Sequence, residues 1–310
     1  MKNDRTVSIP YSLFPNSKFK TQNSTLFPIP YSLTENSKPK TQNSKLFPTP
    51  VTIELSQLLL ATSLIIVNIG LSIVLKMGLT RSLVVASLRM ITQLVLIGYI
   101  LKWLFAQDNP LLILTMALIM TAIAGFSAVD RTKRYVNGLY WNSLISILAS
   151  AAIVTGLAVS QILKVDPWYN PQYLIPLLGM VLGNALNGIC LGVDRFMETI
   201  VREQEQIELL FTLGATRWEA AQHPLQDAMR TGMTPIINSM MVTGLVSLPG
   251  MMTGQILAGA APVQAVRYQI VIMFMIAAAV ALGTLGIISL SFFQIFSPHH
   301  YLHRDRILTR

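Results

Sequence analysis

Arg89 is the residue whose chemistry fits its position least well. It lies inside the apolar stretch Ser82–Leu101, two positions after Ser87 and four before Gln93. A guanidinium group in the hydrocarbon part of a membrane is costly unless it meets a partner or water, so it is a functional candidate by default. We therefore predict that Arg89 lines a solute path. Snorkelling to the membrane surface, or a structural ion pair, is an equally weighted alternative.

Uncharged polar and sulfur-containing side chains recur in two later apolar stretches. Asn184 and Asn187 are three residues apart and therefore share one helix face. Such amides either join helices or line a path, and joining helices is the commoner role. Thioethers suit soft ions such as Cu(I), whereas Fe(II) prefers imidazole and carboxylate, and most methionines serve as flexible packing. The predicted path comprises Arg89, Asn184, Asn187, Asn238, Ser239, Met240, Met241, Met251, Met252 and Gln255.

The polar segment Thr199–Gly232 begins with the pattern of an amphipathic helix. Its apolar residues lie near one helix face, and Gly214 follows them at a position suited to a helix end. The apolar residues are Ile200, Ile207, Leu210 and Phe211.

Thr216 and Glu219 have the spacing of a capping box, in which each residue satisfies the backbone N–H of the other. This predicts a second, short helix that starts there and stops before Pro224. A stiff element with an exposed Trp218 would suit docking into a groove of an ATPase. An ordinary amphipathic surface helix is an equally weighted interpretation.

The motifs of nucleotide and hydrolytic chemistry are missing from the sequence. There is no G-x-x-x-x-G-K-[ST] and no Gly-Lys pair to hold phosphates, and H-E-x-x-H and G-x-S-x-G are also absent. We therefore expect no catalytic residue and no cofactor in this chain. If transport is driven by ATP, then ATP and Mg²⁺ bind a separate subunit. His299, His300 and His303 could bind a metal, but a solvated tail is the favoured interpretation. Cys190 is read as a packing residue.

The composition places most of this chain in lipid. Of 310 residues, 52% are hydrophobic and only 12% are charged, which is more apolar material than one water-soluble core could bury. The net charge of +9 gives little support to a nucleic-acid partner, because the first fifty residues hold seven basic and two acidic side chains.

The apolar runs predict an all-α, polytopic membrane protein with about seven transmembrane helices. The charge-free stretch Thr231–Val266 is too long for one ordinary helix, so we expect a span up to about Leu248, a break at Pro249-Gly250 and a short, partly inserted helix. The other spans are expected at Ser56–Leu75, Ser82–Leu101, Pro110–Val129, Gly138–Leu163, Pro167–Val193 and Tyr268–Ser297.

Three regions are expected along the chain. Residues 1–50 contain a 20-residue repeat rich in Pro, Asn, Ser and Lys and are expected to be disordered. Residues 51–297 form the transmembrane domain, and 298–310 a basic tail. Basic segments at 130–134, 195–230 and 304–310 alternate as cytoplasmic loops of a plasma (inner) membrane protein. The amino-terminal tail is then outside, although its own basic residues would favour the inside.

Two segments carry a resemblance to known permeases. Glu208-Leu-Leu-Phe-Thr-Leu-Gly214-Ala215-Thr216 is similar to the coupling loop of ABC importer-type permeases, although the usual later Leu-Pro is displaced and His223-Pro224 lies nearby. The block Pro235–Gly259, followed by Ala265–Met275, closely resembles the FetB-like iron-export permeases, which include the plant permease subunit of aluminium tolerance.

The resemblance covers roughly residues 51–295 and implies a permease subunit that exports iron or another small solute. It implies a separate ATP-binding subunit and two copies of each chain, and a twofold axis would close a pore from two such halves. The coupling residues that it implies are Glu208, Gly214, Ala215, Thr216, Trp218 and Glu219.

Two other classes of function remain open. An ATP-independent channel or secondary transporter would be expected to carry intramembrane carboxylates, and the spans from Ser56 to Val193 offer only loop acids. A membrane scaffold would recruit a cytoplasmic partner through Thr199–Arg230. For the permease itself, an anionic solute fits Arg89 and the amides, a soft metal ion fits the methionines, and the residue types do not choose between them.

Overall fold

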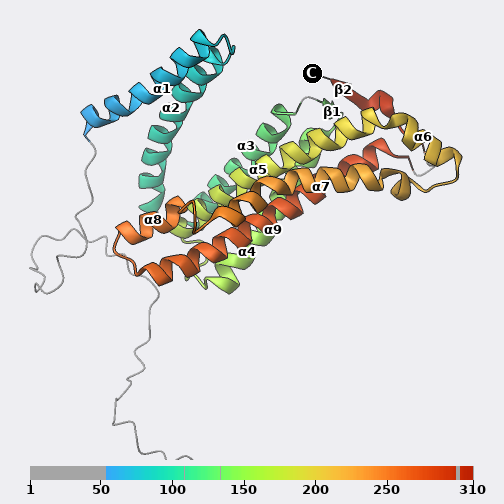
Figure 1. The fold of residues 1–310 in the computed structure, drawn as a ribbon. Helices are drawn as coiled ribbons and strands as arrows, with labels where there is room; N and C mark the ends of the chain where they lie inside the picture. The colour runs from blue at the N-terminus through green and yellow to red at the C-terminus, as the bar shows by residue number, and fades with distance from the viewer. Residues whose placement is uncertain (1–53, 108, 133, 298–300, 310) are drawn as a thin grey trace, which may run out of the picture. The chain divides into compact units, whose positions relative to one another are not determined.

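The computed structural model describes residues 54–107, 109–132, 134–297 and 301–309 (Figure 1). The predicted tail of residues 1–50 lies outside this part of the chain. The predicted all-helical class is confirmed, with one short antiparallel ribbon of β1 and β2 added. The elements are α1 (Leu55–Val74), α2 (Thr80–Phe105), α3 (Pro110–Asp130), β1 (Arg134–Val136), α4 (Leu139–Leu157), a π-helical turn (Ala158–Ile162), α5 (Pro171–Arg202), α6 (Gln204–Thr212), α7 (Arg217–Val242), α8 (Gly250–Leu257), α9 (Pro262–Ile295), a 3₁₀ turn (Arg304–Arg306) and β2 (Ile307–Thr309).

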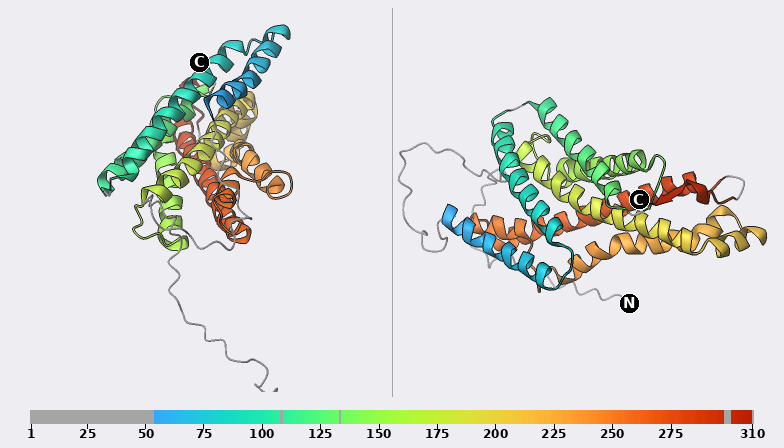
Figure 2. Two further views of the ribbon diagram at one scale, coloured as in Figure 1. Left: turned by 90° about the vertical axis from the view of Figure 1, so that its left-hand side faces the viewer. Right: turned by 90° about the horizontal axis from the view of Figure 1, so that it is seen from above.

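Six helices in the described part of the chain are long and apolar enough to cross a membrane: α1, α2, α3, α4 with its π-helical turn, α5 and α9. The sequence predicted about seven, and α7 accounts for the difference. Its first half carries Arg217, Glu219, Asp227 and Arg230, so its hydropathy is low even though it runs beside α5 and α9 (Figures 1 and 2). The described part of the chain therefore has six apolar spans and a further long helix, α7, that is apolar only in its second half.

Small residues bring α5, α7 and α9 into close contact. A Cβ atom added at Gly232 of α7 would lie 2.8 Å from the backbone oxygen of Gly188 in α5 and 2.7 Å from Cγ2 of Thr284 in α9. A Cβ added at Gly192 would lie 2.6 Å from the same Thr284 methyl group. Helices in membranes associate mainly through such tight packing, because lipid tails are as apolar as leucine.

Polar side chains join α4 to its neighbours. The Ser143 hydroxyl donates to the backbone oxygen of Gly125 in α3 at 2.8 Å, and the Asn142 amide donates to Gln294 of α9 at 2.9 Å. Both serine and asparagine are buried. Satisfying these groups between helices avoids leaving a polar atom unpaired in an apolar interior.

The helix α7 differs from the prediction both in its length after Thr216 and in the residue at which it ends. The short helix expected to stop before Pro224 instead continues as α7 through Pro224 and Pro235. Buried neighbours of Pro224, such as Ala220 and Ala221, pack this segment against the bundle, and that packing offsets the hydrogen bond each proline removes. The helix then ends at Val242, before the expected Leu248, and a turn leads to Pro249, which is the N-cap of α8.

Two other spans are longer than expected. α5 was predicted to end at Val193 but runs to Arg202, because the residues from Asp194 to the break at Glu203 continue the same helix. α9 was predicted from Tyr268 but begins at Pro262, where proline fits the first helical turn since its missing N–H has no helical partner there.

The three basic segments lie at one end of the bundle, which we call the basic end. Strand β1 follows the loop at 130–134 and pairs with β2 near the carboxyl terminus, with Tyr135 opposite Leu308. The ring of Phe211 in α6 lies 6.2 Å, centroid to centroid, from the ring of Phe296, which comes just after α9. Arg306 donates to the backbone oxygen of Gln294 at 2.8 Å. The fold is therefore consistent with the prediction that these three segments lie on one side of the membrane.

The three-helix contact gives a first prediction. Gly232→Ala should lower the thermal midpoint of the detergent-solubilised protein, since the new methyl group meets a backbone oxygen that cannot rotate away; overpacking of this kind costs about 1–3 kcal/mol. Gly183→Ala in α5 is the matched control, because no atom lies within 4 Å of its added Cβ. An equal midpoint for both variants would contradict the proposed packing.

Candidate functional site

The chain reverses direction at the basic end through an elbow formed by α6, Gly214 and the start of α7. Gly214 has φ +88°, a left-handed conformation that favours glycine. The N–H of Ala215 donates to the oxygen of Leu210 at 2.9 Å and that of Gly214 to Phe211 at 3.0 Å, which is a Schellman motif. The prediction that Gly214 ends a helix is confirmed.

The predicted capping box at the start of α7 is also confirmed. The backbone N–H of Thr216 donates to the Glu219 carboxylate at 2.7 Å, and that of Glu219 donates to the Thr216 hydroxyl at 3.4 Å. The amphipathic helix before it is not continuous, however, since the chain breaks at Glu203 between α5 and α6. Ile200 and Ile207 remain buried on either side of that break.

Trp218 does not project freely from the elbow. Its ring stacks on Phe292 of α9 at a centroid distance of 4.3 Å, and it meets Phe293 edge-on at 5.8 Å. The Arg217 guanidinium lies over the same two phenylalanine rings, 5.8 and 5.6 Å from their centroids. These contacts fix the first turn of α7 to the end of α9, and half of the Trp218 surface stays exposed.

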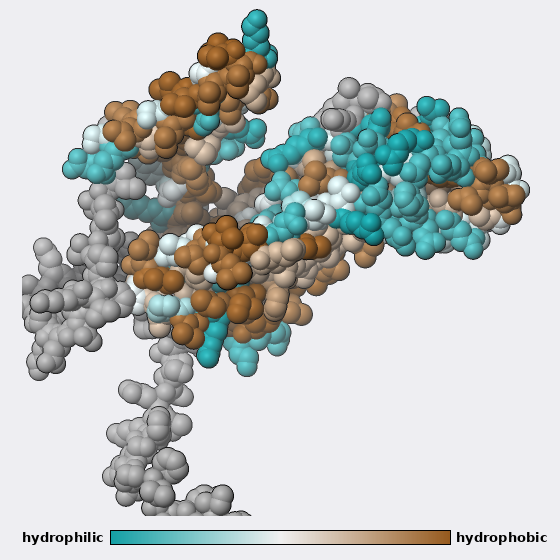
Figure 3. Space-filling model, viewed as in Figure 1, coloured by the Kyte–Doolittle hydropathy of each residue, from teal (hydrophilic) through white to brown (hydrophobic). Residues whose placement is uncertain are grey.

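An apolar surface remains open on the outside of the elbow. Leu209 is 59% exposed, Leu213 is 75% exposed and Trp218, at the start of α7, is 50% exposed. Figure 3 shows apolar surface at the tip of this otherwise hydrophilic end. We call Leu209, Leu213 and Trp218 together the elbow surface. Glu208 lies on α6, beside Leu209 in the sequence, and its carboxylate accepts a hydrogen bond from the Gln204 amide at 2.6 Å.

Ion pairs connect the elbow to the shafts of α5 and α7. Glu203, at the break, accepts a hydrogen bond from Arg202 at 2.9 Å and is 2.9 Å from the His223 ring nitrogen of α7. About two turns earlier in α5, the Arg195 guanidinium lies 2.6 Å from the Asp227 carboxylate of α7. Burial acts to raise the pKa of the Glu203 carboxyl, but the hydrogen bonds from Arg202 and His223 outweigh it and hold that pKa below its usual range.

At the break after α7, at the end of that helix opposite the elbow, lies a cavity of about 280 Å³ that we call the break cavity. Its walls come from α5, α7, the following turn, α8 and α9. Gln269 is 6% exposed, and its side-chain oxygen has no hydrogen-bond partner within the described part of the chain. A buried amide oxygen of this kind is satisfied by a donor from a solute or water. The polar and sulfur-containing lining residues are Met180, Asn184, Ser239, Thr243, Ser247, Met251, Gln269 and Met273.

The break cavity collects some of the predicted path residues and leaves out others. Asn184, Ser239 and Met251 line it, whereas Asn238, Met240, Met241, Met252 and Gln255 do not. Asn184 also donates to the backbone oxygen of Met180 at 2.8 Å, and Asn187 accepts a hydrogen bond from Arg131 at 3.3 Å. Sequence reasoning missed Gln269 and Met273, which lie near the start of the apolar span predicted from Tyr268.

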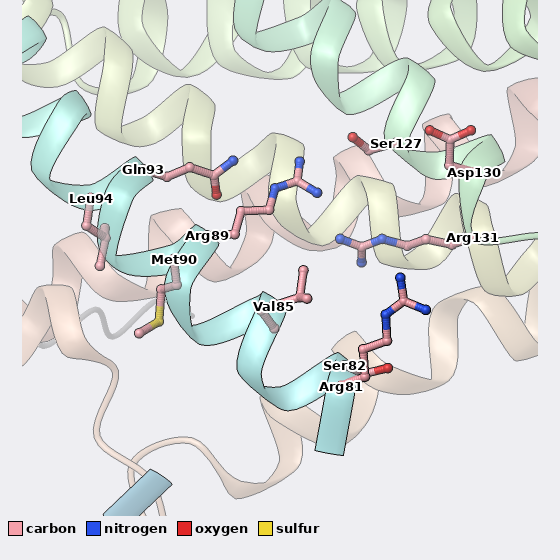
Figure 4. A pocket seen from close by; sticks show the side chains of 11 residues that line it. Arg81, Ser82, Val85, Arg89, Met90, Gln93, Leu94, Ser127, Asp130 and Arg131 are labelled. Atoms are coloured by element: carbon pink, nitrogen blue, oxygen red, sulfur yellow. The ribbon is translucent and has the colours of Figure 1, made fainter. Parts of the chain in front are cut away.

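Arg89 faces a different cavity, of about 930 Å³, between α2 and the end of α3 (Figure 4). We call it the arginine cavity. Arg81 and Arg131 also line it, and Figure 4 shows all three guanidinium groups directed into the same space. Sequence reasoning singled out Arg89 alone, because Arg81 and Arg131 lie at helix ends where basic residues are ordinary. The two cavities share no lining residue.

Fold and site together define a multi-pass helical membrane protein with a polar elbow at one end and a helix break inside. The chain belongs to the family described as Uncharacterised protein family (UPF0014), whose model matches residues 55–296. That match agrees with the resemblance to FetB-like permeases found in the sequence. No solved structure gives a significant match.

Several curated relatives are similar over most of their length. A UPF0014 membrane protein of Synechocystis sp. is 40% identical over 73% of this chain and 87% of its own. The "Probable iron export permease protein FetB" of Escherichia coli is 35% identical over 79% of this chain and 93% of its own. "Protein ALUMINUM SENSITIVE 3" of Arabidopsis thaliana is 34% identical over 64% and 71%. One relative is thus named as a permease, and none of these names describes an enzyme.

The Glu203 contacts predict a specific acid dependence. Because its pKa is lowered in the folded protein, this carboxylate adds stability above the unfolded value of about 4.3, and that stability is lost as pH falls through the lower folded value. The wild-type thermal midpoint should therefore exceed that of Glu203→Gln at pH 5 to 7, and the gap should narrow and close as pH falls below about 4.3. A gap that does not change with pH would exclude this role.

Proposed function

We propose that this chain is the permease subunit of an ABC transporter that exports iron or another small solute. ATP and Mg²⁺ bind a separate subunit, and two copies of each chain form the complex. The basic end is cytoplasmic, in accord with the enrichment of Lys and Arg on that side of membrane proteins. The carboxyl terminus is then inside and the amino-terminal tail outside the plasma (inner) membrane.

The observation that carries the proposal is the continuity of α7. This single helix starts at the elbow, where Trp218 is clamped on α9, and reaches Ser239 at the break cavity. The two residues are separated by about 30 Å at a rise of 1.5 Å per residue. A displacement of the elbow by an ATP-driven partner is thereby carried directly to the cavity, which is the mechanical requirement of a coupled permease.

The elbow surface suits a protein partner. We infer that the exposed side chains of Leu209, Leu213 and Trp218 form the apolar centre of this interface, and that the exposed side chains of Glu205, Glu208 and Glu219 contribute to its polar rim. An apolar centre with a polar rim is the usual composition of a stable interface. Glu208, Gly214, Ala215, Thr216 and Glu219 are proposed to shape this surface rather than to contact ATP.

The break cavity is proposed as part of the solute path. Broken helices persist at membrane depth where they line a cavity, and its donors here are amides, hydroxyls and thioethers. Such a set holds a soft cation or an uncharged solute better than a ferrous ion. Support for iron as the solute therefore comes from the name of the E. coli relative.

The partner surface can be tested with one exposed leucine. Leu213→Asp should reduce co-purification of an ATP-binding subunit from membranes at least tenfold, since a charge would replace the apolar centre. Leu213→Met is the matched control and should retain the partner, because it keeps volume and polarity. Equal recovery of the partner with both variants, or no ATP-binding subunit with wild type, would count against the proposal.

A second test fills the break cavity. Ser239→Phe should lower solute export by at least tenfold while the partner subunit still co-purifies, because the ring occupies the space between α7 and α9. Met240→Phe is the control, since this neighbouring residue does not line the cavity. Export assays with iron loading in whole cells give the readout. Unchanged export in Ser239→Phe would remove the cavity from the path.

A further inference from the structure

The arginine cavity carries more positive charge than the described protein atoms around it neutralise. Arg81, Arg89 and Arg131 face it, and Asp130 is its one carboxylate lining residue. The Asp130 carboxylate accepts a hydrogen bond from Tyr140 at 3.0 Å, and Arg131 donates to the uncharged amide of Asn187. No ion pair is made by Arg81 or Arg89 within the residues that the structure describes.

The depth of these groups makes the excess charge costly. Arg81 lies in the first turn of α2 and Arg131 just after α3, both near the basic end. Arg89 lies eight residues further along α2, about 12 Å deeper at the helical rise. A guanidinium at that depth is stabilised only by a partner or by water in a cavity. An anion entering from the basic end would meet Arg81 and Arg131 first and Arg89 below them.

The other walls indicate the shape of such an anion. Ser82, Gln93 and Ser127 add neutral polar groups beside the arginines, and Val85, Met90 and Leu94 form an apolar side of the same cavity. Planar guanidinium groups bind phosphate oxygens with paired N–H donors, which makes arginine the preferred residue for phosphate recognition. The cavity, at about 930 Å³, is much larger than a phosphate group alone needs.

We propose that the arginine cavity binds the phosphate group of an anionic ligand whose less polar part packs against Val85, Met90 and Leu94. The phosphate accepts hydrogen bonds from Arg81, Arg89 and Arg131. The site is separate from the break cavity, so it stands or falls independently of the proposed solute path. A phospholipid headgroup and a soluble organic phosphate offer the same chemistry.

The test uses the full chain in nanodiscs and separates these two sources. In one arm, native mass spectrometry counts phosphatidylglycerol retained by the protein from mixed phosphatidylglycerol and phosphatidylcholine discs. In the other, calorimetry measures pyrophosphate binding in discs of phosphatidylcholine alone. Arg89→Gln should lower retention or affinity at least tenfold, and Arg89→Lys should fall between this variant and wild type because it keeps charge but not the paired donors.

Lys102→Gln is the matched control, since it removes one cation from the opposite end of α2 and lies outside the cavity. A labelling experiment on wild type covers the case in which Arg89→Gln fails to fold: the bound phosphate should protect Arg81, Arg89 and Arg131 from phenylglyoxal, as mapped by mass spectrometry. Binding in either arm with this protection supports the site. Absence of binding in both arms, or equal losses in Arg89→Gln and Lys102→Gln, overturns it.

Discussion

The close contact among α5, α7 and α9 is the constraint on which the rest of the structure depends. Gly188 and Gly232 allow two backbones to approach so nearly that a single methyl group would collide with a carbonyl oxygen, and Thr284 of α9 fills the space beside them. In lipid, this packing replaces the hydrophobic drive that holds helices together in water. Because it fixes α7 along its length, it sets the positions of the elbow at one end and the break at the other.

The distribution of polarity along α7 follows from this arrangement. Its first half pairs the Asp227 carboxylate with Arg195 of α5 and places His223 beside Glu203 at the end of α5. Its second half, from Thr231, carries no charge and lines the break cavity through Ile236 and Ser239. One helix thus has an end suited to contact with an aqueous partner and an end suited to membrane depth.

Local signals in the sequence were sufficient for features whose partners lie within a few residues. The capping box of Thr216 and Glu219 and the left-handed Gly214 depend on neighbours three or four positions away, and both were predicted correctly. The apolar runs predicted about seven spans, of which six are confirmed, with errors at their ends where adjoining polar segments continue the same helix.

Features that depend on distant partners could not be read from the sequence. The helix continues through Pro224 because α5 and α9 pack on it, and Trp218 is clamped because Phe292 happens to lie beneath it. Arg81 and Arg131 join Arg89 only once α2 and α3 are brought together. Gln269 gave no signal either, since an amide in an apolar run looks the same whether it joins helices or faces a cavity.

The central claim, that α7 transmits motion as one rigid helix, is tested most directly by distances between paired spin labels in the complex with its ATP-binding subunit. Cysteines replace the exposed Gln222, Met241 and Val263 in a Cys190→Ala background. The account predicts that the Gln222–Met241 distance stays the same between nucleotide-free and ATP-trapped states while the Met241–Val263 distance across the break changes. A change confined to the Gln222–Met241 pair would contradict it.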